Sequence, residues 1–174
     1  SQIAAAIKRK ARELEYNVVI AMVDDHSEHA CKQAINELLA QRVEGILVNV
    51  SLKPKRSQKI AEQCANTPVL FLDVDPQSTA FSVLFDPKEG AIQGAEYLIA
   101  LGHQHIALIC GPKDAISSQL RYQGWQQALN TASLAPQAVY HGEWSARSGY
   151  QETQKLISSH IPFSAILVAN DQMA

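Results

Sequence analysis

Apolar residues along the chain follow two spacings in turn, the 3.6-residue spacing of helices and the short continuous runs of buried strands. Residues 3–14 carry their apolar side chains on one helix face. Residues 17–23 (NVVIAMV) then form a β-branched run that is typical of a strand buried on both faces. Ser27 is placed to cap a second helix, whose apolar stripe follows it. The opening of the chain therefore predicts helix, strand and helix.

The same alternation continues to the end of the sequence. Strands are predicted at 45–50, 68–74, 81–85, 105–111, 138–140 and 164–170, and helices at 55–66, 86–101, 114–131 and 146–159. Gly102 follows one of these helices and is suited to end it. Strands that alternate with helices along a chain indicate parallel sheets covered by helices.

The pattern restarts near residue 86, where Asp86 and Pro87 separate a strand from the next helix. We therefore expect an amino-terminal lobe over 1–85 and a carboxy-terminal lobe over 86–174. The second lobe has only about three predicted strands, fewer than a stable open sheet usually needs, so we expect it to be incomplete in this chain. The predicted fold class is α/β, with two doubly wound parallel-sheet lobes.

Composition narrows the classes of function. Fifteen Lys and Arg against 17 Asp and Glu leave a net charge of -2, without the basic excess of a nucleic-acid surface, so these residues are not expected to bind DNA themselves. The sequence has no apolar run of about 18 residues, so no membrane span is expected. The three cysteines, an odd number inside apolar segments, predict buried reduced thiols and a cytoplasmic location: Cys31, Cys64 and Cys110.

Polar side chains gather at the predicted carboxyl ends of the strands, where open α/β sheets bind ligands. Asn49, Asp73, Asn170 and Asp171 lie at strand ends, Ser117 and Arg121 follow the strand that ends at Gly111, and Leu72, Phe85 and Trp144 could form apolar walls. An Arg fork and side-chain amides can bind adjacent hydroxyls, and an aromatic face packs against sugar C–H groups. The set predicts a sugar site, while the alternative is that these polar residues only form turns and helix caps.

Several segments resemble one known family along essentially the whole chain: SQIAAAIK, LLAQRVEGILVN, LFLDV, ALGHQHIALICGP, WSARSGY and LVANDQMA. The family is that of the LacI/GalR-type bacterial transcriptional regulators, and three stretches indicate its lactose-responsive members. The resemblance implies a periplasmic-binding-protein-like core whose two lobes hold a small, galactoside-like sugar effector. It also implies a homodimer or higher homo-oligomer, and allosteric control of operator DNA binding through a headpiece that this sequence does not contain.

The resemblance also implies site residues. Effector contacts would fall on Ile3, Asn49, Leu72, Asp73, Phe85, Ser117, Arg121, Trp144 and Asn170, most of which the strand-end argument also selects. Gln2 would hydrogen-bond Asp73 across the mouth of the cleft, and Lys8 and Met22 would lie at the contact between subunits. Two positions depart from the family pattern near the effector, Ala115 in place of a polar residue and Pro87 at the start of the crossing helix, so the exact sugar stays open.

Metal sites and enzyme active sites are the main alternatives to this interpretation. Asp73 and Asp75 alternate across a strand end, and the two histidines of 103–105 are too few ligands, so no metal or cofactor is expected. Asp24 and Asp25 resemble a receiver-domain acidic pocket, but the restart near residue 86 does not fit that fold. Ser117, Ser118, His103 and Asp114 could suggest a hydrolase, yet no G-x-S-x-G motif occurs, and no catalytic residue is expected.

Two other function classes remain as alternatives. The first is a periplasmic-type sugar-binding protein of a transport system, which shares the expected architecture but is disfavoured by the three thiols and by the LVANDQMA stretch. The second is an enzyme of doubly wound type, which turnover of nitrophenyl glycosides would reveal.

Overall fold

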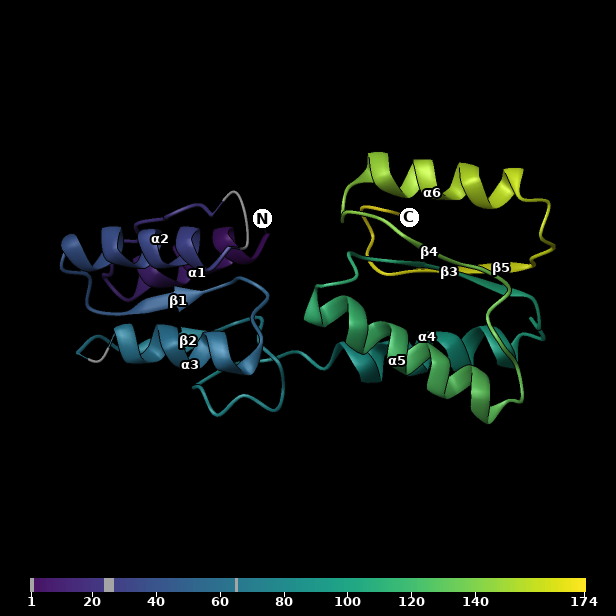
Figure 1. The fold of residues 1–174 in the computed structure, drawn as a ribbon, viewed down its shortest axis with the longest axis horizontal. Coiled ribbons are helices and arrows are strands. Elements are labelled where there is room, and N and C mark those ends of the chain that lie inside the picture. Colours follow the sequence, from purple (N-terminus) through teal and green to yellow (C-terminus); the bar gives the residue numbers. More distant parts are fainter. Residues whose placement is uncertain (1, 24–26, 65) are drawn as a thin grey trace.

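The computed structural model describes residues 2–23, 27–64 and 66–174, and the side chain of Gln2 lies outside that description. Helices alternate with parallel strands throughout these ranges. Figure 1 shows two lobes side by side, each with helices on both faces of its strands. The predicted α/β class with two parallel-sheet lobes is confirmed.

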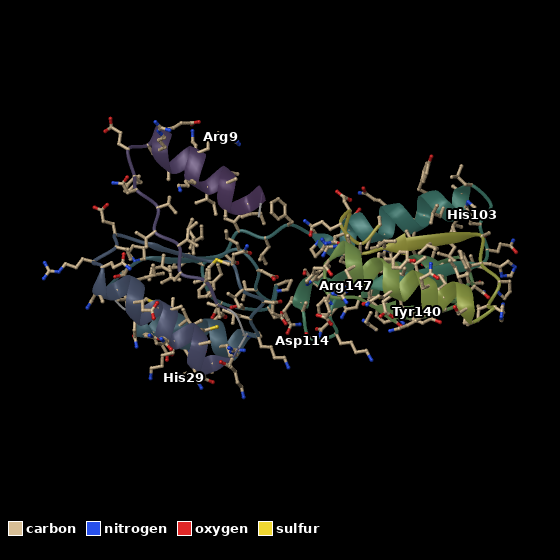
Figure 2. All side chains as sticks on the ribbon, turned by 90° about the horizontal axis from the view of Figure 1, so that it is seen from above. Arg9, His29, His103, Asp114, Tyr140 and Arg147 are labelled. Atoms are coloured by element: carbon tan, nitrogen blue, oxygen red, sulfur yellow. The ribbon has the colours of Figure 1, made fainter. Side chains whose placement is uncertain are left out.

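The amino-terminal lobe is built around one apolar core. Its elements are α1 (Gln2–Glu13), α2 (Glu28–Ala40), β1 (Ile46–Val48), α3 (Pro54–Gln63) and β2 (Val69–Phe71). In the described ranges its sheet consists of β1 and β2, which pair in parallel with Ile46 opposite Val69. Helices α2 and α3 lie side by side on one face of these strands, joined by the Lys59–Glu28 ion pair and the Gln63–Asn36 hydrogen bond, and α1 (purple in Figure 2) lies on the other. The predicted cap of α2 is confirmed, since Ser27 Oγ accepts a hydrogen bond from the Ala30 N–H at 3.1 Å.

Two predicted strands of this lobe differ from the structure. Residues 17–23, all of them described, form no strand, so that prediction was wrong. The neighbours Val19 and Ile20 are both exposed and Met22 is 81% exposed, so the run lacks the cover that would make it a buried strand. The predicted strand at 81–85 is reduced to one parallel bridge between Phe71 and Ser82.

The carboxy-terminal lobe follows the prediction closely. Its elements are α4 (Pro87–Ala100), β3 (Ile106–Cys110), α5 (Ile116–Thr131), β4 (Val139–His141), α6 (Ala146–Ser158) and β5 (Ala165–Val168). The strands pair in parallel in the order β4-β3-β5, and every residue of the central strand β3 is buried, as a continuous apolar run predicts. Helices α4 and α5 cover one face of the sheet and α6 the other (Figure 1). Gly102 follows the C-cap of α4 with φ +90°, which confirms its predicted role.

The chain passes from the first lobe to the second just before α4 (teal in Figure 1). Asp86 caps that helix, because its Oδ1 accepts hydrogen bonds from the N–H groups of Lys88 and Glu89, each at 3.0 Å. Pro87 occupies the first turn, where its missing N–H and fixed φ are tolerated. This departure from the family pattern is therefore compatible with a well-formed helix start. A lobe boundary at 85–86 stays a prediction.

The three cysteines, all within the described ranges, are buried free thiols as predicted: Cys31, Cys64 and Cys110. Burial raises the pKa of the Cys64 thiol, and raises the pKa of Cys110, on the central strand, to about 12. Thiols that are kept protonated in this way are chemically inert at neutral pH.

Candidate functional site

Arg121 is the centre of a polar group on the carboxy-terminal lobe. It lies on α5 one turn after Ser117, and its Nη1 donates a hydrogen bond to the Ser117 backbone oxygen at 3.0 Å. Its guanidinium carbon lies 5.9 Å from the centroid of the Trp144 ring, a cation–π distance. The side chain is half-buried. Arg121 is thus oriented by one backbone oxygen and one aromatic face.

The Asp73 carboxylate, in the amino-terminal lobe, interacts electrostatically with the Arg121 guanidinium. Burial lowers the pKa of Arg121, and the negative charge of Asp73 works in the opposite direction. Asp73 is itself half-buried and lies just after β2, at the carboxyl end of that strand. Guanidinium groups stay protonated in proteins, so Arg121 carries a positive charge that interacts electrostatically with the Asp73 carboxylate of the amino-terminal lobe.

Trp144 is positioned by three features of its own lobe. Its backbone has φ 64°, in the left-handed region that a bulky residue rarely adopts. Its backbone oxygen accepts a hydrogen bond from Asn170 Nδ2 at 3.3 Å, and Asn170 Oδ1 in turn accepts from the Met173 N–H at 3.0 Å. The ring lies over Gly111, where an added Cβ would come within 2.5 Å of Cζ2. The sequence pattern identified Gly111 only as a strand end, whereas the structure shows that the Trp144 ring requires it.

The predicted site residues fall into two groups. Asp73, Ser117, Arg121, Trp144 and Asn170 are brought together by the contacts and charges just described. Asn49 follows β1 and is exposed, while the half-buried Leu72 follows β2 and donates its N–H to the Val48 oxygen at 2.8 Å. Ile3 on α1 is 41% exposed, and Phe85 before α4 is 81% exposed. Among the described residues, no hydrogen bond or ring contact joins this second group to Arg121.

The remaining predicted residues lie on the surface or outside the description. Lys8 on α1 is exposed, as is Met22. The predicted hydrogen bond of Gln2 rests on a side chain that is not described. Asp24 and Asp25, weighed as an acidic pocket, lie outside the described residues.

Sequence reasoning missed Ser51. Its Oγ accepts a hydrogen bond from the Ile116 N–H at 2.8 Å, although the two residues belong to different lobes. The one signal in the sequence was Ala115, which precedes Ile116 and carries no polar side chain of its own. A helix that begins at such a position leaves a buried N–H in need of an acceptor from elsewhere.

The residues that could suggest a hydrolase or a metal site do not gather at one place in the described part of the structure. His103 and Asp114 lie at opposite ends of the carboxy-terminal lobe (Figure 2), and His103 Nδ1 instead lies 3.0 Å from Ser164 Oγ. Asp75 Oδ1 accepts from the Gln77 N–H at 2.8 Å and so supports a turn. In the part of the chain that the structure describes, no group of three or more His, Cys, Asp or Glu could hold a metal. Nor is any described helix long and apolar enough to cross a membrane.

A hollow of about 340 Å³ lies elsewhere, between α2 and α3. Its lining includes the ion pair between Lys59 Nζ and Glu28 Oε1 at 2.8 Å, together with Arg56 and Cys31. Charges of both signs line it, and its described lining residues include no aromatic side chain. We therefore place the candidate site at the group around Arg121, which has an aromatic face beside directional donors.

Known proteins resemble this chain over its full length. The sequence pattern of one family, described as periplasmic binding proteins and sugar binding domain of LacI family, matches residues 1–174. The lactose operon repressor of Escherichia coli (strain K12) is 44% identical over 174 residues, which is 100% of this chain and 48% of the repressor. That of Klebsiella pneumoniae is 36% identical, again over 100% of this chain and 49% of the repressor.

Solved structures of Lac repressors also superpose closely on this chain. The dimeric Lac repressor with an 11-residue carboxy-terminal deletion superposes with a TM-score of 0.95 at 44% identity, covering 99% of this chain and 63% of that one. The Lac repressor dimer bound to operator and the anti-inducer ONPF superposes with a TM-score of 0.94, over 99% of this chain and 60% of that one. The present chain spans about half the length of the curated relatives it matches. It belongs to the LacI family and carries that family's periplasmic-binding-protein-like, sugar-binding domain.

Proposed function

We propose that this chain is the effector-binding core of a sugar-responsive transcriptional repressor. A small, galactoside-like sugar binds between the two lobes and allosterically controls operator binding by the whole protein. Support comes from the identity to two lactose operon repressors and from the likeness to a Lac repressor bound to operator and ONPF. A transport-type sugar-binding protein is not favoured, because the curated relatives are repressors.

One observation carries the proposal, namely the way in which Arg121 is held. Its guanidinium is fixed by the Ser117 oxygen and the Trp144 face, and the described residues engage only Nη1 in hydrogen bonds. The remaining N–H groups suit adjacent hydroxyls of a sugar, and the exposed part of the indole suits its C–H face. Asp73, from the other lobe, supplies a charged acceptor for hydroxyls on the opposite side.

The site includes all nine predicted effector contacts, and the boundary between lobes lies at 85–86. The whole protein is a cytoplasmic homodimer or higher homo-oligomer, consistent with its buried free thiols, and the exposed Lys8 and Met22 lie at the subunit contact. It performs no chemistry on the sugar, as expected of a relative of the lactose and ribose operon repressors.

Calorimetric titration of the full-length protein with isopropyl thiogalactoside tests this proposal. Arg121→Ala removes charge-assisted hydrogen bonds worth about 1.5–3 kcal/mol, so affinity should fall by about tenfold or more. Arg12→Ala removes an exposed arginine from the end of α1 and should bind as the wild type does. Equal affinity in the Arg121→Ala variant would remove the site from this group, and no heat from a folded wild-type protein would exclude the galactoside.

A further inference from the structure

Helix α5 begins without a cap from its own lobe. Its N-cap residue is Ala115, which makes no side-chain hydrogen bond, whereas α2, α4 and α6 are capped by a neighbouring Ser or Asp. The first N–H of α5, that of Ile116, donates instead to Ser51 Oγ at 2.8 Å. A residue of the amino-terminal lobe therefore caps a helix of the carboxy-terminal lobe.

Ser51 is anchored firmly to its own lobe. It directly precedes Leu52, which is fully buried in the amino-terminal core and forms a parallel bridge with Val74. The Leu52 oxygen also accepts from the Asp75 N–H at 3.3 Å. The Ser51 hydroxyl is thus held by backbone that is tied to the end of β2, two residues beyond Asp73.

The donor of this hydrogen bond, the Ile116 N–H, is held equally firmly in the carboxy-terminal lobe. Ala115 and Ile116 are both buried, and α5 packs against α4 so closely that a Cβ at Gly124 would overlap the backbone oxygen of Lys88. The hydrogen bond therefore joins two rigid parts of different lobes rather than two loops. A small change in the relative placement of the lobes would break it, because hydrogen bonds weaken steeply with distance and angle.

We infer that Ser51 is a positioning residue that links the two lobes and thereby sets the affinity of the cleft for its sugar. The first two turns of α5 carry Ser117 and Arg121, so the Ser51 bond fixes where these groups stand relative to Asp73. It favours the lobe placement in which Asp73 interacts electrostatically with Arg121. The effect on sugar affinity rests on the proposed function, whereas the link between the lobes does not.

Four variants of the full-length protein separate a link between lobes from a simple helix cap. Ser51→Ala removes the acceptor, and Ser51→Thr retains a hydroxyl. Ser51→Ala combined with Ala115→Ser gives α5 a cap of its own while the link stays broken. Ser27→Ala removes the matched serine cap of α2, within the amino-terminal lobe. Each is titrated with isopropyl thiogalactoside by calorimetry, melted without sugar, and studied by hydrogen exchange over residues 113–119.

In the Ser51→Ala variant we expect affinity for isopropyl thiogalactoside to fall about three- to tenfold, the loss of one neutral hydrogen bond. Ser51→Thr should restore it, and Ser27→Ala should lower the melting temperature without changing affinity. The double variant should regain melting temperature but not affinity. Full recovery of affinity in the double variant would show that Ser51 is merely a cap and would overturn the inference.

Hydrogen exchange of the sugar-free protein keeps this test separate from the proposed function. If the wild type binds no isopropyl thiogalactoside, the galactoside part of the proposed function fails, and exchange alone decides the link. Faster exchange over 113–119 in Ser51→Ala than in either the wild type or Ser27→Ala supports it. Unchanged exchange in Ser51→Ala overturns it.

Discussion

At the scale of single residues, the proposed site depends on small and polar neighbours that hold larger side chains in place. Trp144 keeps an unfavourable positive φ because Asn170 binds its backbone oxygen and Gly111 leaves room for its ring. Arg121 in turn rests on that ring. Strain of this kind persists only where the surroundings over-determine it, and it is frequent at binding sites.

Gly111→Ala should displace the Trp144 ring, because the new Cβ would overlap it. We expect the free energy of unfolding to fall by about 1–3 kcal/mol, the usual cost of overpacking, and sugar affinity to fall with it. Urea unfolding and calorimetry measure the two effects. Gly45→Ala is the matched control, since its Cβ would meet only the Pro68 oxygen at an ordinary 3.6 Å. A Gly111→Ala protein as stable as this control would contradict the packing described.

Cys110 makes stability depend on alkaline pH. Burial raises the pKa of its thiol from an ordinary 9.0 to about 12, so between these values the unfolded chain releases this proton while the folded chain keeps it. The free energy of unfolding must then fall as pH rises through that window, by at most about 1.4 kcal/mol per pH unit. Cys110→Ala should flatten the slope between about pH 9 and 11 in urea unfolding. Parallel slopes for the two proteins would refute this.

At the scale of elements, the sequence predicted the carboxy-terminal lobe better than the amino-terminal one. A continuous apolar run identifies a strand only when other elements cover both of its faces. Residues 106–110 are covered in this way and form the central strand, whereas 17–23 are also a largely apolar run but lack the cover. The local sequence pattern shows that a segment is apolar, but it does not show whether a partner strand lies beside that segment. The short pairing at Ser82 has the same cause.

The contact between α4 and α5 offers a prediction at this scale. Gly124 lies where α5 meets α4, and a Cβ there would overlap the Lys88 oxygen and reach Ala91 Cβ at 3.0 Å. Gly124→Ala should therefore destabilise the protein by about 1–3 kcal/mol, since backbone cannot give way as a flexible side chain can. Gly90→Ala, on α4 with open space around it, should instead stabilise by about 0.5–1 kcal/mol through helix propensity. Urea unfolding that ranks the two variants in the opposite order would contradict this helix contact.

At the scale of the whole molecule, the rule that ligands bind beyond the carboxyl ends of strands selected residues from both lobes. Asp73, Ser117, Arg121, Trp144 and Asn170 come together because each follows, or lies in a helix just after, the end of a parallel strand. The sequence pattern could not identify Ser51, because its hydrogen-bond partner, Ile116, is 65 residues away and belongs to the other lobe. Contacts that depend on how two lobes sit together leave no local periodicity in a sequence.

A sugar that binds between the lobes should contact both, and a crystal structure of the full-length protein with isopropyl thiogalactoside tests this most directly. We predict that the sugar hydroxyls lie within hydrogen-bonding distance of Arg121 on one side and Asp73 on the other. Its C–H face should pack on Trp144. A sugar bound elsewhere, for example in the hollow between α2 and α3, or one that contacts a single lobe, would contradict a site formed by both lobes.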